Sequence, residues 1–388
     1  MRPLEGIRVI TLESFGAAPY GTMLLADLGA EVVKVENPST GGDASRGVGP
    51  HMLGPGDSQY FQSFNLGKQS VALDLAKAED RDAFHTLVAG ADAVVNNLRG
   101  DLPEKLELDY AHLGRVNPAI VCLHISAYGR DNGRKAWPGY DFLAQAEAGL
   151  MSMTGEPDGP PCRIGVSMID YMTGLTGAVG LLGCLLRAKT TGRGCDVDTS
   201  LFEVATHQHA YSATWYLNTG AVPTRLPRGS HQSMSPVQTV RTGDGWIYLM
   251  CMKGKFWEIL AERIGRAEFI ADPRFSTPAA RLANRDELTR ELDAAMGART
   301  TAEWLDILGG AIPAAPIFAV DEAFANPFMA EIGMVTSVDH PAYGELKVLA
   351  SPLKIDGERP AKAIAPPLGI GNERYLGERP AAAGRNVA

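Results

Sequence analysis

The chain lacks any paired cysteine motif. Its 388 residues include five scattered cysteines, and no two of them form a C-x-x-C arrangement. An odd, dispersed set predicts free thiols in a reducing compartment rather than a disulfide framework or a cysteine-ligated metal site. The first residues also lack an apolar signal core. We therefore expect a cytoplasmic protein with no structural metal.

An excess of basic residues is also absent, because the formal net charge is -9. Nucleic acids and anionic membranes are bound by basic faces, so we expect neither as a partner. The most apolar run, residues 172–186, is interrupted by four glycines. It is shorter than the roughly 20 residues that a membrane span needs. This run predicts a buried helix.

Nucleotide and hydrolase motifs are incomplete. Residues 16–22 follow a strand-like run and precede a helical one, but no lysine completes a P-loop. Ala18 stands where a dinucleotide fingerprint needs its middle glycine. His207 and His209 would face different sides of a helix, and no G-x-S-x-G elbow occurs. The loop at 16–22 is either a tight turn or a close approach to some other ligand.

The length predicts two domains. Strand-like runs at 7–12, 31–35, 71–75, 93–96 and 120–125 alternate with helical patterns, which favours a parallel sheet covered by helices. Residues 202–216 predict one long helix. A polar stretch then separates this part from a region of different texture. The expected boundaries are 1–217 for a large domain, 218–236 for a linker, 237–325 for a small domain, and 326–388 for a second linker and a return to the large domain.

Asp170 stands between an apolar segment and a stripe of glycines at 174, 177, 180 and 183. On a helix, glycines three apart leave a surface that another backbone can approach. Asp170 itself has two interpretations. It could be a helix N-cap, because Asp accepts hydrogen bonds from the free amides there, or it could be a catalytic carboxylate. The two roles are compatible, since a helix N-terminus stabilises the ionised form.

Several segments, in their order and spacing, resemble the class III CoA-transferases, also called the CaiB/BaiF family. Its members include formyl-CoA transferase, carnitine CoA-transferase and the 2-methylacyl-CoA racemases. The resemblance runs over nearly the whole chain. The segments that carry it are residues 3–9, 24–36, 41–43, 64–68, 73–75, 139–146, 191–194, 272–275 and 281–288.

The resemblance implies an α/β fold with a Rossmann-like large domain built from both chain ends. A smaller α+β domain would be inserted into it, and two chains would form an interlocked homodimer. It also implies that Asp170 is the nucleophile that accepts acyl and CoA groups in turn. Coenzyme A and acyl-CoA would be substrates, and no tightly bound cofactor is implied.

The resemblance further assigns contacts residue by residue. Arg99 could pair with a CoA phosphate, or it could be a solvated surface charge. The CoA contacts that it implies are Gly16, Ala17, Leu73, Asp74, Leu75, Asn97 and Arg99. The substrate-pocket residues that it implies are Arg46, Val48, Tyr60, Tyr140, Lys253 and Gly254.

Tyr140 separates two activities of the family. The racemases have a His-Asp pair where this chain has Tyr140-Asp141. A phenol with a pKa of about 10 is a poor base at neutral pH, so the chain predicts a transferase rather than a racemase. A CoA-binding protein without activity is a third hypothesis.

The size and charge of the expected pocket side chains predict the kind of acyl group. Val48 leaves more room than the Trp of the formyl-CoA relatives, and Lys253 and Lys255 flank a shortened glycine loop. We therefore expect a larger acyl group, such as a dicarboxylate whose free end pairs with Lys253, Lys255 or Arg46.

Overall fold

The computed structural model describes residues 2–377, and its contacts divide them into two units. Unit 1 comprises residues 2–148, 165–208 and 328–377, so both ends of the described chain contribute to it. Unit 2 comprises residues 149–164 and 209–327. Unit 2 is larger than the small domain expected at 237–325, because it also includes residues 149–164, residues 209–217 and the expected linker 218–236.

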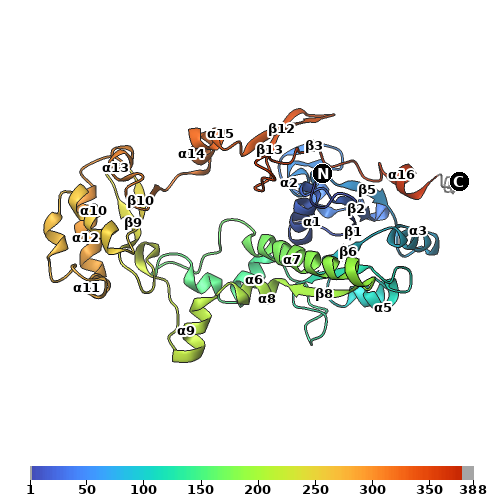
Figure 1. The fold of residues 1–388 in the computed structure, drawn as a ribbon, viewed down its shortest axis with the longest axis horizontal. Helices are drawn as coiled ribbons and strands as arrows, with labels where there is room; N and C mark the ends of the chain where they lie inside the picture. The colour runs from blue at the N-terminus through green and yellow to red at the C-terminus, as the bar shows by residue number, and fades with distance from the viewer. Residues whose placement is uncertain (1, 378–388) are drawn as a thin grey trace. The chain divides into compact units, whose positions relative to one another are not determined.

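Unit 1 is a mixed α/β structure around a six-stranded parallel sheet (Figure 1). The strand order is β5-β2-β1-β6-β7-β8, so the chain moves one way from β1 and then returns to β6 on its other side. This is the order of a doubly wound Rossmann sheet, with its switch point between β1 and β6. The strands are β1 (Arg8–Leu12), β2 (Glu31–Glu36), β5 (Gln69–Ala72), β6 (Ala93–Asn96), β7 (Val121–Ser126) and β8 (Cys195–Ser200).

Helices cover both faces of this sheet. Successive side chains of a strand point to opposite faces, so each strand contacts helices on both sides. Cys122 of β7 joins a core with Phe84, whereas Leu123 lies against Gly177 on the other face. The helices of unit 1 are α1 (Ala17–Asp27), α2 (Gln59–Asn65), α3 (Ala78–Ala89), α4 (Leu102–Lys105), α5 (Tyr110–Leu113), α6 (Asp141–Glu147), α7 (Met168–Thr191), α8 (Leu201–His207) and α16 (Asn372–Leu376).

The glycine stripe lets α7 touch α1 backbone to backbone. A Cβ on Gly174 would lie 2.3 Å from the Ala17 carbonyl oxygen, and one on Gly21 would lie 2.4 Å from the Gly174 carbonyl oxygen. Farther along, Gly177 faces β7 and Gly180 faces Val197 of β8. By length and composition α7 could cross a membrane, but here it packs on α1, β7 and β8.

The C-terminal part returns to the start of unit 1. The amide nitrogen of Ala72 donates to Asn372 Oδ1 at 2.8 Å, and that of Gly371 donates to the Ser70 carbonyl oxygen at 2.9 Å. His340 Nε2 pairs with Asp57 Oδ2 at 2.9 Å. The hairpins in this region are β3 (Met52–Gly54) with β4 (Asp57–Ser58), and β12 (Val335–His340) with β13 (Gly344–Leu349).

Unit 2 has its own α+β core. A three-stranded antiparallel sheet of β9 (Val237–Arg241), β10 (Trp246–Met250) and β11 (Ala314–Pro316) packs on helices through buried Trp257, Phe269 and Phe275. Its helices are α9 (Tyr211–Thr219), α10 (Gly254–Arg263), α11 (Pro278–Ala283), α12 (Arg285–Met296), α13 (Thr301–Leu308) and α14 (Val320–Ala325), and α15 (Pro327–Glu331) follows.

Two expected elements were wrong in extent. The helix expected at 202–216 is interrupted, because Ala210 takes a φ of 45° and ends any regular turn between α8 and α9. The strand expected at 71–75 stops at Ala72, so residues 73–75 follow β5 instead of extending it.

Candidate active site

Asp170 lies in the first turn of α7, where Ser167 is the N-cap residue. The N-cap interpretation of Asp170 was therefore wrong by three positions. The nearby backbone amides still have no partner farther back in the helix, and their partial positive charge favours an anion. The start of the helix thus favours a negative charge here, but the effect of burial on the pKa of Asp170 is larger.

A pocket of about 250 Å³ opens beside Asp170 within unit 1. Its walls follow the carboxyl ends of β1, β6 and β7, which straddle the switch point of the sheet. Doubly wound sheets bind their ligands in this crevice. The lining residues are Ser14, Phe15, Gly16, Ala17, Asn97, Leu98, Arg99, Ile125, Ser126, Ala127, Trp137, Pro138, Gly139, Tyr140, Asp170 and Leu201.

Gly16 packs directly on the Asp170 carboxylate. A Cβ at this position would lie 2.6 Å from Asp170 Oδ2, closer than carbon and oxygen can approach. The residue must therefore be glycine for the carboxylate to keep its place. The sequence left open whether this loop was a turn or a close approach, and the structure shows a close approach to a side chain of the chain itself.

A second carboxylate holds the start of α7. Asp141 is buried, and its Oδ2 accepts a hydrogen bond from the Asp170 backbone nitrogen at 2.8 Å. Burial raises the pKa of Asp170 to about 7, and the negative charge of Asp141 contributes in the same direction. Asp170 thus exchanges its proton near neutral pH, whereas an exposed aspartate is ionised there.

Aromatic rings surround the carboxylate. The Tyr140 ring is 63% exposed and meets the Phe15 ring edge-on, with 6.2 Å between centroids. Burial raises the pKa of Tyr60 to about 12, with a further contribution from the charge of Asp170, so these two groups are neighbours. Two aromatic residues that were not among the expected site residues also lie here: Tyr171, which directly follows Asp170, and Phe64, with 5.8 Å between their ring centroids.

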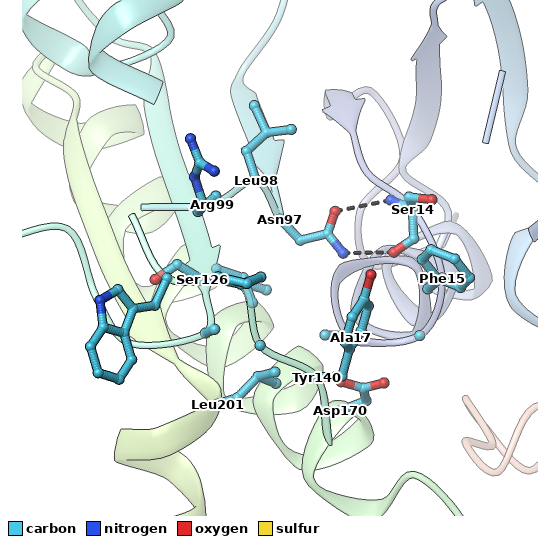
Figure 2. Close-up of a pocket in the computed structure, with 16 residues that line it drawn as sticks. Ser14, Phe15, Ala17, Asn97, Leu98, Arg99, Ser126, Tyr140, Asp170 and Leu201 are labelled. Atoms are coloured by element: carbon cyan, nitrogen blue, oxygen red, sulfur yellow. Dashed lines mark hydrogen bonds between the residues drawn. The ribbon is translucent and has the colours of Figure 1, made fainter. Parts of the chain in front are cut away.

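Asn97 and Arg99, expected as CoA contacts, already have partners in the protein. Asn97 Nδ2 donates to the Ser14 carbonyl oxygen at 2.7 Å, and the Ser14 amide donates to Asn97 Oδ1 at 2.9 Å (Figure 2). Arg99 Nε donates to Asp101 Oδ1 at 2.6 Å while the side chain stays partly exposed at the pocket wall. Asn97 therefore fixes the loop after β1. The positive charge of Arg99 faces the pocket but is partly neutralised by Asp101.

Other expected site residues lie away from this pocket. Leu73 is buried in the core, and the Asp74 backbone nitrogen donates to Asp80 Oδ2 at 2.8 Å. Arg46 is buried, with its guanidinium forming two hydrogen bonds to Glu36. Leu75 and Val48 are partly buried and do not line the pocket either.

Lys253 and Gly254 belong to unit 2. Lys253 is the residue before α10, and Gly254 begins that helix. Both are exposed, as is Lys255. A Cβ on Gly254 would meet no atom within 4 Å, so packing within unit 2 does not explain this glycine.

The comparisons with known proteins decide the family. A model described as CoA-transferase family III matches residues 4–372. The chain belongs to CoA-transferase family III. It is 35% identical over 377 residues to a succinyl-CoA:mesaconate CoA-transferase of Haloarcula hispanica, which covers 95% of this chain and 94% of that protein.

Two further relatives support the same family and its fold. A succinate–glutarate CoA-transferase of Agrobacterium fabrum is 34% identical over 336 residues, covering 84% of this chain and 82% of that protein. A solved CaiB/BaiF family protein from Brucella suis is 32% identical, with a TM-score of 0.82 over 96% of this chain and 98% of that chain. The resemblance drawn from the sequence segments is confirmed.

Proposed function

We propose that this family III chain transfers CoA from an acyl-CoA thioester to a carboxylic acid, with Asp170 as the nucleophile. The observation that carries the proposal is the position of the Asp170 carboxylate. It lies at the switch-point pocket, in contact with Gly16 and at the start of α7. A carboxylate held there by backbone can attack a thioester carbonyl that enters the pocket.

The reaction proceeds through covalent intermediates. Asp170 attacks the donor carbonyl, the carbon–sulfur bond breaks, and an acyl-aspartyl anhydride and CoA thiolate result. The thiolate attacks the aspartyl carbonyl, which gives an aspartyl-CoA thioester and releases the donor acid. The acceptor carboxylate then attacks this thioester, which releases CoA thiolate and leaves a second anhydride between Asp170 and the acceptor. The thiolate attacks the acceptor carbonyl of this anhydride, which gives the new acyl-CoA and frees the Asp170 carboxylate. One difficult exchange is thus divided into easier steps.

The surroundings of Asp170 suit these steps. Each attack places negative charge on a carbonyl oxygen, and we propose that the backbone amides at Gly16 and Ala17, which line the pocket, stabilise that charge. With a pKa of about 7, Asp170 is a stronger nucleophile than an ordinary carboxylate and is still substantially ionised at neutral pH.

We propose that CoA enters along the wall formed by Gly16, Ala17 and Arg99, which line the pocket. Asn97 and Arg99, which line the pocket, would contact the nucleotide portion, with Asp74 and Leu75 farther along the same surface, whereas Leu73 is buried in the core. Arg99 can bind a phosphate only by sharing its charge with Asp101, so Arg99→Ala should raise the KM for acyl-CoA more than it lowers kcat.

The acceptor is proposed to be a dicarboxylate. Proteins named for mesaconate and glutarate, which are both dicarboxylates, are similar to this chain over most of its length. Arg46 already neutralises Glu36, so Lys253 or Lys255 is the better candidate for a cation that receives the second carboxylate. Tyr60, whose pKa is raised in part by the charge of Asp170, is proposed to shape the acyl pocket.

An interlocked homodimer is proposed as the working form. One face of α7 exposes Val179 at 71% and Leu186 at 73%, with Leu175 on the same side. Apolar side chains in such a row mark an interface, and a second copy of the chain would cover them. We also propose a cytoplasmic location, since all five cysteines are free thiols.

The test is a substrate panel followed by mass spectrometry. The protein is incubated with succinyl-CoA and a series of mono- and dicarboxylates, and new CoA thioesters are counted with Asp170→Asn as the control. Transfer to four- and five-carbon dicarboxylates, lost in the variant, supports the proposal. Transfer restricted to one- or two-carbon acids would refute the dicarboxylate, and exchange of an α-proton without transfer would indicate a racemase.

A further inference from the structure

Six charged side chains lie buried beneath the loop after β1, and the proposed reaction uses none of them. Each is at most 6% exposed. Three are acidic and three are basic, so the group is neutral as a whole. Buried charges are costly unless they are paired, which implies that they hold a specific geometry. The six residues are Glu13, Lys34, Glu36, Asp43, Arg46 and Lys68.

Lys34 anchors Asp43 below the loop. Lys34 Nζ lies 2.8 Å from Asp43 Oδ2 and donates to the Glu13 carbonyl oxygen at 2.8 Å. Burial alone would raise the pKa of Asp43, but the Lys34 charge and hydrogen bonds from Ser14 and Ser45 outweigh it and lower the pKa to about 2. Asp43 is therefore ionised at neutral pH.

Asp43 in turn holds Ser14. Ser14 Oγ donates to Asp43 Oδ1 at 2.6 Å, while Asn97 binds the Ser14 backbone on its other side. The next residue, Phe15, has a φ of 62°, a left-handed conformation that is strained for a non-glycine residue. Backbone in this conformation persists only where its surroundings hold it, and Ser14 is tied on both sides.

The fixed turn leads directly to the nucleophile. Phe15 packs against Tyr140, and Gly16 touches the Asp170 carboxylate. We propose that Asp43, held by Lys34, is a positioning residue that acts through Ser14, and through its own contact with the Phe15 amide, to place the Phe15-Gly16 backbone against Asp170. The inference rests on the proposed function, since it concerns the alignment of the same nucleophile.

The experiment compares Ser14→Ala and Asp43→Asn with the unsubstituted protein in the transfer assay. Misplacing a reacting group by about 1 Å can cost about 100-fold in rate. We expect kcat to fall about 10- to 100-fold in each variant, with the KM for acyl-CoA within about twofold. A merely structural role would lower the folded fraction and the melting temperature instead, without this separation of kcat from KM.

A double-variant cycle tests whether Asp43 acts through Ser14. If it does, Ser14→Ala should lower kcat no further in a protein that already carries Asp43→Asn. If Asp43→Asn does not fold, because the buried Lys34 has lost its anion, the double variant Lys34→Met with Asp43→Asn is used instead. It removes both charges. Ser45→Ala is the matched control, because its buried hydroxyl has no hydrogen-bond partner among residues 2–377 and the change deletes the same atom from the same cluster.

The outcomes separate the two proposals. An unsubstituted protein that transfers no CoA would overturn the proposed function, and this inference with it. Transfer by the unsubstituted protein, together with unchanged kcat in Ser14→Ala or fully multiplicative losses in the cycle, would overturn the inference alone. A similar loss in Ser45→Ala would also overturn it, because the effect would then come from disturbing the cluster.

Discussion

Replacing Asp170 with Asn should stabilise the protein, and the gain should depend on pH. The ordinary pKa of an aspartate near 3.8 is raised in the folded protein to about 7, mainly by burial and further by Asp141. Between these values the folded state binds more protons than the unfolded state, so stability falls as pH rises. Each unit of pKa shift corresponds to about 1.36 kcal/mol, so the free energy of unfolding falls by about 4 kcal/mol between the two pKa values, and this loss is complete above pH 7.

Asn carries no charge, so Asp170→Asn should avoid this loss. We expect a free energy of unfolding higher than that of the unsubstituted protein by up to about 4 kcal/mol at pH 8, and by little at pH 4. Urea unfolding followed by circular dichroism at both pH values measures the difference. Asp131→Asn, at an exposed carboxylate, controls for the substitution itself. A gain that is equal at both pH values, or a loss at pH 8, would refute the reasoning.

Three further substitutions probe the geometry around Asp170. Gly16→Ala places a methyl 2.6 Å from the carboxylate, so kcat should fall about 100-fold with the melting temperature nearly unchanged. Gly174→Ala places a methyl 2.3 Å from the Ala17 carbonyl oxygen, so chemical denaturation should show a loss of about 1–3 kcal/mol. Asp141→Asn keeps an acceptor but removes a like charge, so the rise of kcat/KM with pH should shift to lower pH, and an unshifted profile would contradict the assigned cause.

The parts of the fold that follow from periodicity were predictable. The alternation of apolar strands and helices indicated a parallel sheet, and the sheet has the expected covering on both faces. The glycine stripe indicated a close approach, which Gly174 and Gly21 make. Ends of elements were less predictable, because they depend on local backbone conformation such as the φ of 45° at Ala210.

The sequence singled out Asp170, which the structure places at the wall of the pocket, but it revealed little of what surrounds that residue. Asp170 stood out because it precedes a glycine-rich helix, which local sequence reveals. The roles of Asn97 and Arg46 could not be read from local sequence. Each depends on a partner that is distant in sequence or belongs to no motif, which is Ser14 for Asn97 and Glu36 for Arg46. The Asp43 contact is of the same kind, since 29 residues separate it from Ser14.

The central claim is that Asp170 carries the CoA and acyl groups covalently. Its most direct measurement is peptide mass spectrometry after brief incubation with acyl-CoA and trapping with hydroxylamine or borohydride. We predict a modified peptide whose mass change maps to Asp170 and which is absent from Asp170→Asn. Transfer activity with no adduct on that residue, or an adduct on another carboxylate, would contradict the account.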